Sequence, residues 1–465
     1  MENTQGHVAE DAARFVHGLY KDALGTDQEI FSKEVAVKGD DLSKQPFLAV
    51  SDTYMEFVRS GFIAVQHGKL DSLSGRTVTT SSPGHKIDDV AAIVLATGFS
   101  ASPSLSFLPS QVLQTLTLSA DDLNNTVALA FHGTHHPEVP NLGFVGFYRS
   151  PYWGVMEMQA RFVATLWSAG GISSPLLPPA MAAALKRDTS SERTLALRTD
   201  PRMSQFPMGD YPWLMQEFAE ALGLERAPFA NALPKLPPGD QEMDILIPAR
   251  YPDRDLTGEQ QTEVQRLLRQ AEETVWAGFQ EGRFTSRAVF RSLLGEWKLE
   301  RTLVSRRTSH PSGHFSGTAK FLLREGTKDG RDAAFKKMEA NGHVGYEYLY
   351  VEEGDFKADN GMTFRASRRY IWRYDEKKDK ISVWFAQTDD QRRADYLFHE
   401  VEFQVPTDGK DSESWEATAG HLCIDDFYNV QYQFHFAAVN LTDWRLSYTV
   451  NGPQKDYTID GVYTR

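Results

Sequence analysis

Side chains alternate with a period of two residues from about residue 292 to the end of the chain. Because successive side chains of a β-strand point to opposite faces, this alternation predicts strands. Segments separated by Gly, Asp or Asn turns number roughly ten, at the spacing expected for a barrel or a sandwich. Aromatic and charged side chains on both faces favour a closed barrel over two packed sheets. Three sets of residues share a face: Phe364, Ala366, Arg368, Tyr370, Trp372 and Tyr374; Val430, Tyr432, Phe434 and Phe436; Trp444, Leu446, Tyr448 and Val450.

The proline distribution separates this barrel region from the residues before it. Nineteen of the 22 prolines precede residue 286, whereas five of the nine tryptophans follow it. In the earlier part, Ala91–Leu95 and Val127–Phe131 are short apolar runs typical of buried parallel strands. Met156–Ala169 has no Gly or Pro and suits a helix packed on a sheet. This order predicts an α/β layer and an α+β multidomain chain.

We expect three parts along the chain: 1–225, 226–290 and 291–465. The middle part begins with a proline-rich linker that extends to Leu256. Thr257 and Gln260 then have the spacing of a capping box, and apolar residues recur at helical spacing behind them. The sequence therefore predicts an amphipathic helix that ends near Gly282.

Composition excludes several functional classes. The 49 basic and 63 acidic residues give a formal net charge of −14, which argues against a partner that is nucleic acid. The one cysteine, Cys423, forbids an intrachain disulfide and a multi-cysteine metal cluster. The first residues lack the apolar segment of a secretory signal, and no run approaches the ~20 apolar residues of a membrane span. We therefore expect a cytoplasmic protein without a membrane span.

Glycine spacing excludes the common nucleotide-binding motifs. None of the 34 glycines is separated from another by a single residue, so G-x-G does not occur. The dinucleotide fingerprint and the kinase glycine loop are therefore absent from this sequence, and the P-loop pattern G-x-x-x-x-G-K-[ST] does not occur either.

Five short segments follow one another between residues 41 and 185: Gln45–Asp52, Ser60–Ile63, Ala96–Phe99, Pro140–Gly146 and Glu157–Arg161. In their order and spacing, they resemble the carboxy-terminal half of flavin-containing monooxygenases. The resemblance implies a partial, Rossmann-like flavoprotein region that uses FAD and NADPH, in which the cofactor carries out the chemistry. It also implies that backbone at Ala96, Thr97, Gly98, Phe99 and Gly146 packs against the flavin.

The chain departs from that family at the phosphate-binding loops. In the family, a glycine-rich helix start holds the flavin pyrophosphate, and a second such loop holds the nicotinamide nucleotide. Both loops belong to sequence that would precede residue 1. We therefore expect an incomplete monooxygenase-like fragment. It is a truncated gene product, a degenerate remnant, or a half whose flavin domain a second polypeptide completes as its partner.

A second set of segments lies between residues 290 and 465: Leu294–Trp297, Phe315–Ala319, Arg369–Trp372, Phe398–His399, His421–Tyr428 and Gly452–Tyr457. Through these segments, the region resembles an uncharacterised domain family that is found alone or fused behind flavin monooxygenase-like domains. The resemblance implies a lipocalin-like barrel with no established activity.

A candidate pocket follows from alternation near the end of the chain. His421, Cys423 and Asp425 would share one face of a strand, and His399 would reach them from a nearby strand. The group could form a ligand pocket, a proton-transfer site, a metal site or a hydrogen-bond network that fixes strand register. Charged groups inside a barrel need partners. The residues assigned to this pocket and its partners are Arg369, His399, His421, Cys423, Asp425, Tyr428, Lys455 and Arg465.

The histidine-rich segment His132–Glu138 is punctuated by Gly and Pro and is typical of a polar loop, so we predict no metal site. Two functions then compete. The first is a flavin- and NADPH-dependent monooxygenase-like fragment fused to a barrel. The second is a barrel that binds a small-molecule ligand, with the front region as scaffold. A third, acid–base chemistry through His399 and His421, is less favoured.

Overall fold

The computed structural model describes residues 10–44, 51, 53–82, 85–97, 102–118, 127–147, 153–198, 210–236, 241–307, 311–327, 346–405 and 414–465. These residues form two compact units. The first contains residues up to His17, Lys38–Ala49 and Gly68–Trp276, and the second contains Gly18–Val37, Val50–His67 and Ala277–Arg465.

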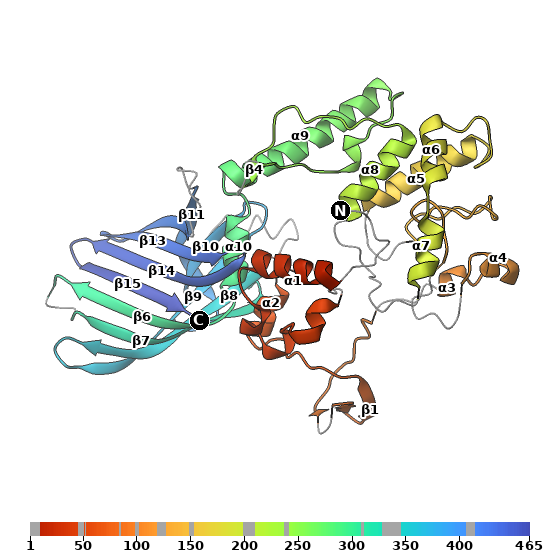
Figure 1. The fold of residues 1–465 in the computed structure, drawn as a ribbon. Coiled ribbons are helices and arrows are strands. Elements are labelled where there is room, and N and C mark those ends of the chain that lie inside the picture. Colours follow the sequence, from red (N-terminus) through yellow and green to blue (C-terminus); the bar gives the residue numbers. More distant parts are fainter. Residues whose placement is uncertain are drawn as a thin grey trace. The chain divides into compact units, whose positions relative to one another are not determined.

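The second unit is built around a closed antiparallel barrel of ten strands (Figure 1). Each strand pairs with its neighbours in sequence, and β15 pairs with β6 to close the sheet. The predicted barrel is therefore confirmed. The strands are β6 (Gly295–Ser305), β7 (Gly313–Glu325), β8 (Tyr346–Ala358), β9 (Thr363–Asp375), β10 (Lys380–Ala386), β11 (Ala394–Gln404), β12 (Ser414–Cys423), β13 (Asp426–Ala437), β14 (Asn440–Asn451) and β15 (Asp456–Thr464).

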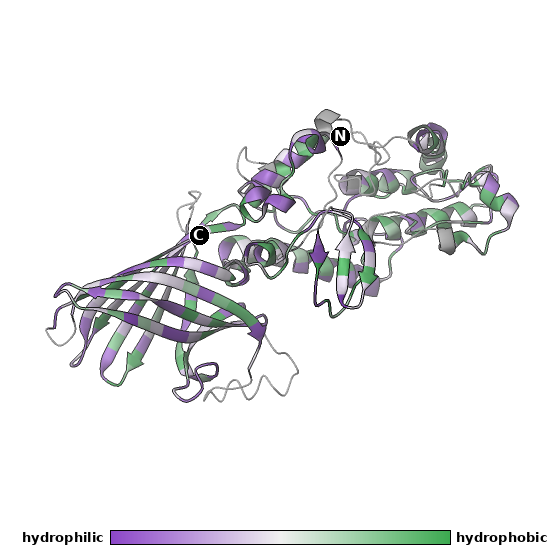
Figure 2. Cartoon of the chain, turned by 90° about the horizontal axis from the view of Figure 1, so that it is seen from below, coloured by the Kyte–Doolittle hydropathy of each residue, from purple (hydrophilic) through white to green (hydrophobic). Residues whose placement is uncertain are grey.

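Alternation along the strands sorts side chains between the interior of the barrel and its outer face. Figure 2 shows hydrophilic and hydrophobic residues following one another along the strands. The inward side chains form one buried cluster that includes Trp297, Phe321, Trp372, Phe434 and Trp444. At about 25 cal/mol per Å² of apolar surface removed from water, burial of such large aromatic side chains stabilises this unit.

Helix α10 (Thr285–Ser292) fills one end of the barrel. Its residues Val289 and Phe290 belong to the same buried cluster as the inward side chains. The ring of Phe290 stacks on Tyr348 of β8, with centroids 4.3 Å apart. This end of the barrel is therefore packed solid.

A segment from the front of the chain packs on the barrel. Helix α2 (Tyr54–Arg59) places Phe57 against the barrel core. Arg465 donates a hydrogen bond from Nη1 to Oε2 of Glu56 at 2.8 Å, and its guanidinium lies 3.9 Å from the ring centroid of Trp297. Burial raises the pKa of Glu56 and lowers the pKa of Arg465 to about 10, so desolvation offsets much of their attraction.

The first unit is mixed α/β. Its largest buried cluster joins α5 (Trp153–Ser168), α6 (Pro179–Arg187) and α8 (Asp210–Leu222). The predicted helix at 156–169 corresponds to α5 and is confirmed, but in the described residues it packs against helices and not on a sheet. The other elements in the described parts of this unit and at its borders are α1 (Glu10–Leu24), α3 (Ser102–Leu105), α4 (Ser110–Thr115), α7 (Ser190–Leu197), η3 (Gly39–Ser43), η4 (Pro248–Arg250), β1 (Leu70–Ser74), β2 (Thr77–Thr80), β3 (Lys86–Ile87), β4 (Lys235–Leu236) and β5 (Gln241–Glu242); η1 (Gln28–Ile30) and η2 (Lys33–Val35) lie in the second unit.

The predicted capping box and amphipathic helix are also confirmed. Helix α9 spans Gly258–Gln280 and ends just before Gly282. The backbone N–H of Thr257 donates to Gln260 Oε1 at 3.0 Å, and the N–H of Gln260 donates to Thr257 Oγ1 at 3.3 Å.

The two predicted parallel strands of this unit are wrong. Ala91–Leu95 is irregular and exposed, with Val94 at 85% and Leu95 at 83%, because this run pairs with no strand among the described residues. Val127–Phe131 is buried, but only Ala130 makes a bridge, to His135. Positive φ angles at Phe131 and His132 turn the chain back on itself there. Every described strand pair is antiparallel, so a Rossmann-like sheet is not seen in the described residues.

Removal of one partner tests the Glu56–Arg465 pair. Glu56→Ala leaves the guanidinium of Arg465 buried without its carboxylate, and we expect a loss of about 3 kcal/mol in the free energy of unfolding. Urea denaturation followed by tryptophan fluorescence measures this loss. Glu296→Ala breaks an exposed pair with Lys320 and serves as the control, with an expected change below about 1 kcal/mol. Equal losses in the two variants would contradict the assigned role.

Candidate functional site

A cavity lies inside the barrel, beyond the residues that contact α10. Along β8, Tyr348 contacts α10, whereas the next inward residues, Tyr350 and Glu352, line the cavity. Centres of water molecules can occupy about 40 Å³ of it, and the whole hollow, including its opening to solvent, measures about 540 Å³. Its walls are Arg301, Tyr350, Glu352, Arg368, Tyr370, Trp372, Val383, Phe398, Tyr428, Trp444, Leu446, Tyr448, Tyr457, Ile459 and Tyr463.

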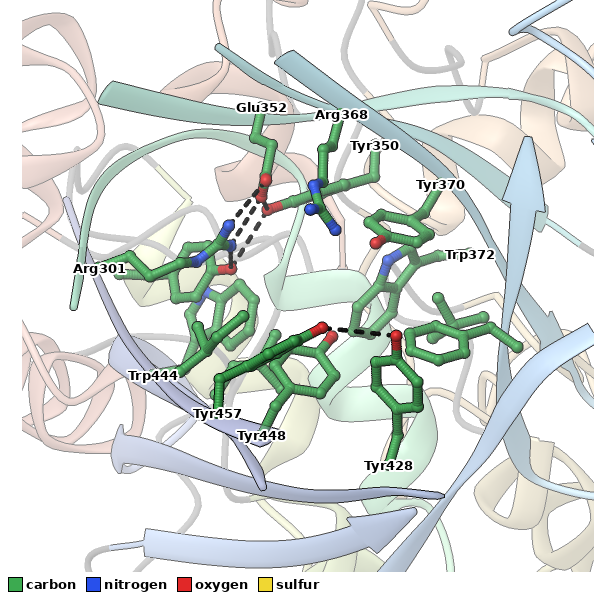
Figure 3. Close-up of a pocket in the computed structure, with 15 residues that line it drawn as sticks. Arg301, Tyr350, Glu352, Arg368, Tyr370, Trp372, Tyr428, Trp444, Tyr448 and Tyr457 are labelled. Carbon is green, nitrogen blue, oxygen red and sulfur yellow. Dashed lines mark hydrogen bonds and ion pairs between the residues drawn. The ribbon is translucent and has the colours of Figure 1, made fainter. Parts of the chain in front are cut away.

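A buried ion pair crosses one wall of this cavity (Figure 3). Arg301 donates from both Nη1 and Nη2 to the two carboxylate oxygens of Glu352, each at 2.8 Å. The hydroxyl of Tyr350 donates to Glu352 at 2.7 Å, and Arg301 donates to the hydroxyl of Tyr463 at 3.1 Å. The carboxylate is thus surrounded by donors.

These donors set the charge of the pair. Burial alone would raise the pKa of Glu352, but the Arg301 guanidinium and the hydrogen bonds outweigh it, so the pKa is lowered. Burial raises the pKa of the nearby Tyr350 well above its usual value. Glu352 is therefore ionised and Tyr350 is a neutral donor. The charges of Arg301 and Glu352 cancel.

A second guanidinium, that of Arg368, faces the same cavity. Arg368 pairs with Glu352 across β8 and β9 in the strand register, yet the Glu352 carboxylate is held by Arg301. The side chain of Arg368 is exposed to solvent although it stands on the inner face, because the cavity opens to solvent. Its interaction with Tyr370 raises its pKa, so the side chain remains a cation.

Tyr428 and Tyr457 line the opposite wall, whereas Lys455 and Asp426 lie near them without lining the cavity. Lys455 Nζ donates to the hydroxyl of Tyr428 at 2.8 Å, and the hydroxyl of Tyr457 donates to the same oxygen at 3.4 Å. Asp426 accepts hydrogen bonds from the backbone N–H groups of Gln454 and Lys455 and lies 3.9 Å from Lys455 Nζ. Of the pocket residues expected from the sequence, Tyr428 and Lys455 are placed together here.

His399 and His421 both pack against Phe398; His399 is buried, whereas His421 is partly exposed. The ring of Phe398 contacts both, with centroids 4.4 and 5.1 Å away. His399 is 2% exposed, and its Nε2 lies 2.6 Å from the Tyr432 hydroxyl. Burial lowers the pKa of His399 to about 3 and lowers the pKa of His421. His399 is therefore neutral near pH 7, and neither ring is among the cavity-lining residues.

Three further expected pocket residues lie elsewhere. Cys423 ends β12 on the same face as His421, but Asp425 lies in the following turn and is exposed. Arg369 stands on the outer face of β9, where its Nη1 donates to Gln391 Oε1 at 2.8 Å. The structure thus brings neither Asp425 nor Arg369 to the cavity.

Arg465 pairs with Glu56, as described above, and is not a cavity residue.

The expected flavin-contact residues lie in the first unit. Ala96 and Thr97 are exposed and irregular, while Gly98 and Phe99 lie outside the described residues. Gly146 has a φ of +69°, and its N–H donates to Gln159 Oε1 at 2.9 Å.

In the described ranges, no group of three or more His, Cys, Asp or Glu side chains could hold a metal ion. No helix in the described ranges is long and apolar enough to cross a membrane.

Comparison with known proteins identifies the barrel. Residues 293–465 match the model of a family of unknown function, DUF6314. This DUF6314 domain forms the ten-stranded barrel, and the predicted likeness of this region to an uncharacterised family is confirmed. Neither this match nor the structural comparison supports the likeness of residues 41–185 to flavin monooxygenases. The sequence matches none of the curated proteins with which it was compared.

A solved structure that matches is that of an S-type phycobiliprotein lyase, CPES, from Guillardia theta. The match has 12% sequence identity and a TM-score of 0.24, and it covers 40% of this chain and 93% of that chain.

Titration of His399 predicts how stability depends on pH. Its pKa falls from about 6.5 in the unfolded chain to about 3 in the fold, so folding favours the neutral ring. This contribution is complete above pH 6.5 and is lost as the pH falls toward 3. From pH 6.5 to 5 we expect His399 to account for about 2 kcal/mol of lost unfolding free energy.

Urea denaturation at the two pH values measures this loss. His399→Gln removes the titration, so the variant loses about 2 kcal/mol less than the unaltered protein over this interval. His314→Gln changes a half-exposed histidine on the outer face and is the control. The same pH dependence in all three proteins would show that His399 is not the buried neutral group described.

Proposed function

We propose that the DUF6314 domain binds a small organic molecule in the cavity of its barrel. The observation that carries this proposal is an asymmetry of the interior. One end is filled by α10, whereas the other retains a hollow of about 540 Å³ that opens to solvent. The centre of a small barrel is a common place for a ligand.

The chemistry of the walls supports the same function. Apolar and aromatic side chains such as Trp372, Phe398, Leu446 and Ile459 offer contact area to a ring or a short chain. Six tyrosines add hydroxyl groups that orient a polar end of the ligand. A mostly apolar wall with a few placed polar groups is typical of small-molecule sites.

A neutral aromatic probe tests the proposal. We expect 2-naphthamide to bind the full chain with one molecule per protein, measured by isothermal titration calorimetry. Ile459→Trp places a larger ring in the hollow and should abolish this binding.

Val462→Trp is the matched control, because Val462 lies on the outer face of the same strand. Thermal denaturation of both variants verifies that the barrel remains folded. Equal binding by the Ile459 variant, or no binding of naphthalene-sized probes to the unaltered chain, would overturn the proposal.

The monooxygenase-like activity with FAD and NADPH stays a prediction of the sequence resemblance. Its direct test is the absorbance spectrum of the purified chain, before and after incubation with FAD and gel filtration. Retained flavin absorbance is the expected result of that prediction. Loss of all flavin on gel filtration would rule it out for this polypeptide alone.

A further inference from the structure

The charges on the cavity wall do not cancel. Two guanidinium groups, from Arg301 and Arg368, face one carboxylate, that of Glu352. Arg301 and Glu352 satisfy each other through two parallel hydrogen bonds of 2.8 Å. Among the described residues, no hydrogen bond or ion pair joins Arg368 to a carboxylate. One positive charge therefore remains facing the hollow.

Other charged groups near the cavity leave this excess in place. Lys455 lies 3.9 Å from the buried carboxylate of Asp426 and donates to Tyr428, so its charge already has a partner. The cavity-lining phenols do not supply a negative charge, because burial raises the pKa values of Tyr350, Tyr428 and Tyr448. The guanidinium of Arg368 therefore remains as the excess positive charge of the wall, among neutral hydroxyl groups.

The hydroxyl groups are arranged as donors. Tyr428 accepts hydrogen bonds from both Lys455 and Tyr457, which leaves its own proton to be donated. Figure 3 shows Arg368 beside Tyr350 and Tyr370, with Tyr428 and Tyr457 on another side of the same hollow. Because Arg368 donates to no carboxylate among the described residues, a ligand that brings a carboxylate gains a charge-assisted hydrogen bond here that a neutral ligand does not gain.

We infer that the ligand of this cavity is a small aromatic or short apolar carboxylic acid whose carboxylate pairs with Arg368. This inference rests on the proposed function and specifies its ligand class. The single excess charge matches a monoanion, whereas a phosphate dianion would remain half uncompensated. The planar guanidinium suits the two oxygens of a carboxylate, and the aromatic wall holds the apolar part of the acid.

Two probes of nearly equal shape separate charge from size. The full chain is titrated with 2-naphthoate and with 2-naphthamide by isothermal titration calorimetry at low salt. We expect the acid to bind ten- to a hundredfold more tightly than the amide, as typical for a charge-assisted hydrogen bond in a partly buried site. Arg368→Gln should abolish this preference and leave binding of the amide within about twofold.

Arg365→Gln is the matched control. It removes the same charge from the outer face of the same strand, where Arg365 lies near Asp355 and Glu353. This variant should retain the full preference for the acid, and Arg368→Lys should retain part of it. If Arg365→Gln lowers the preference as much as Arg368→Gln, the effect comes from overall charge and the inference fails.

The outcomes distinguish this inference from the proposed function. Equal affinity of the unaltered chain for acid and amide overturns the carboxylate inference and leaves a neutral-ligand barrel. Binding of neither probe overturns the proposed function itself. If Arg368→Gln does not fold, the unaltered chain and Ile459→Trp still test the inference. The inference requires that the unaltered chain prefers the acid to the amide and that Ile459→Trp removes this preference.

Discussion

Closure of the sheet by β15 and β6 is the constraint on which the rest of the second unit depends. Tyr457 to Thr464 pair with Ser305 to Lys298, so the barrel has no free edge at this junction. A closed sheet leaves an interior that side chains must fill. At one end, α10 and the stacked rings of the core fill it. At the other, polar groups enter the interior and the filling is incomplete, which creates the cavity.

Burial of charge in that interior explains which groups are structural and which face a ligand. Arg301 and Glu352 compensate each other, and Tyr350 and Tyr463 occupy the remaining hydrogen-bonding positions. Such a closed network fixes the relation between β6, β8 and β15. Arg368 is opposite Glu352 in register but does not share its carboxylate. The same network that stabilises the wall therefore leaves Arg368 as the group that can pair with something else.

The barrel could be predicted from sequence because its signal is periodic and local. Alternation at Arg368, Tyr370 and Trp372 assigns all three to one face, as the structure shows. The same parity places Arg369, which was expected to partner a charge inside the barrel, on the outer face of β9. Asp425 lies outside the strand in which it was expected for another reason. The turn at Ile424 has a φ of +60°, a conformation that Ile rarely adopts, so no sequence signal marked where the strand ends.

Other contacts carry no sequence signal because they join distant segments. Nothing local indicates that Glu56 pairs with Arg465 or that α2 packs on the barrel. The apolar run Ala91–Leu95 shows the converse, since composition typical of a strand is insufficient where no neighbouring strand pairs with it.

The most direct measurement is a crystal structure of the chain with 4-bromobenzoate, whose bromine can be located by anomalous scattering. The account predicts one bromine in the barrel cavity among Trp372, Phe398 and Ile459, with the carboxylate within hydrogen-bond distance of Arg368. Bromine sites only on the protein surface, with water alone filling the cavity, would contradict it.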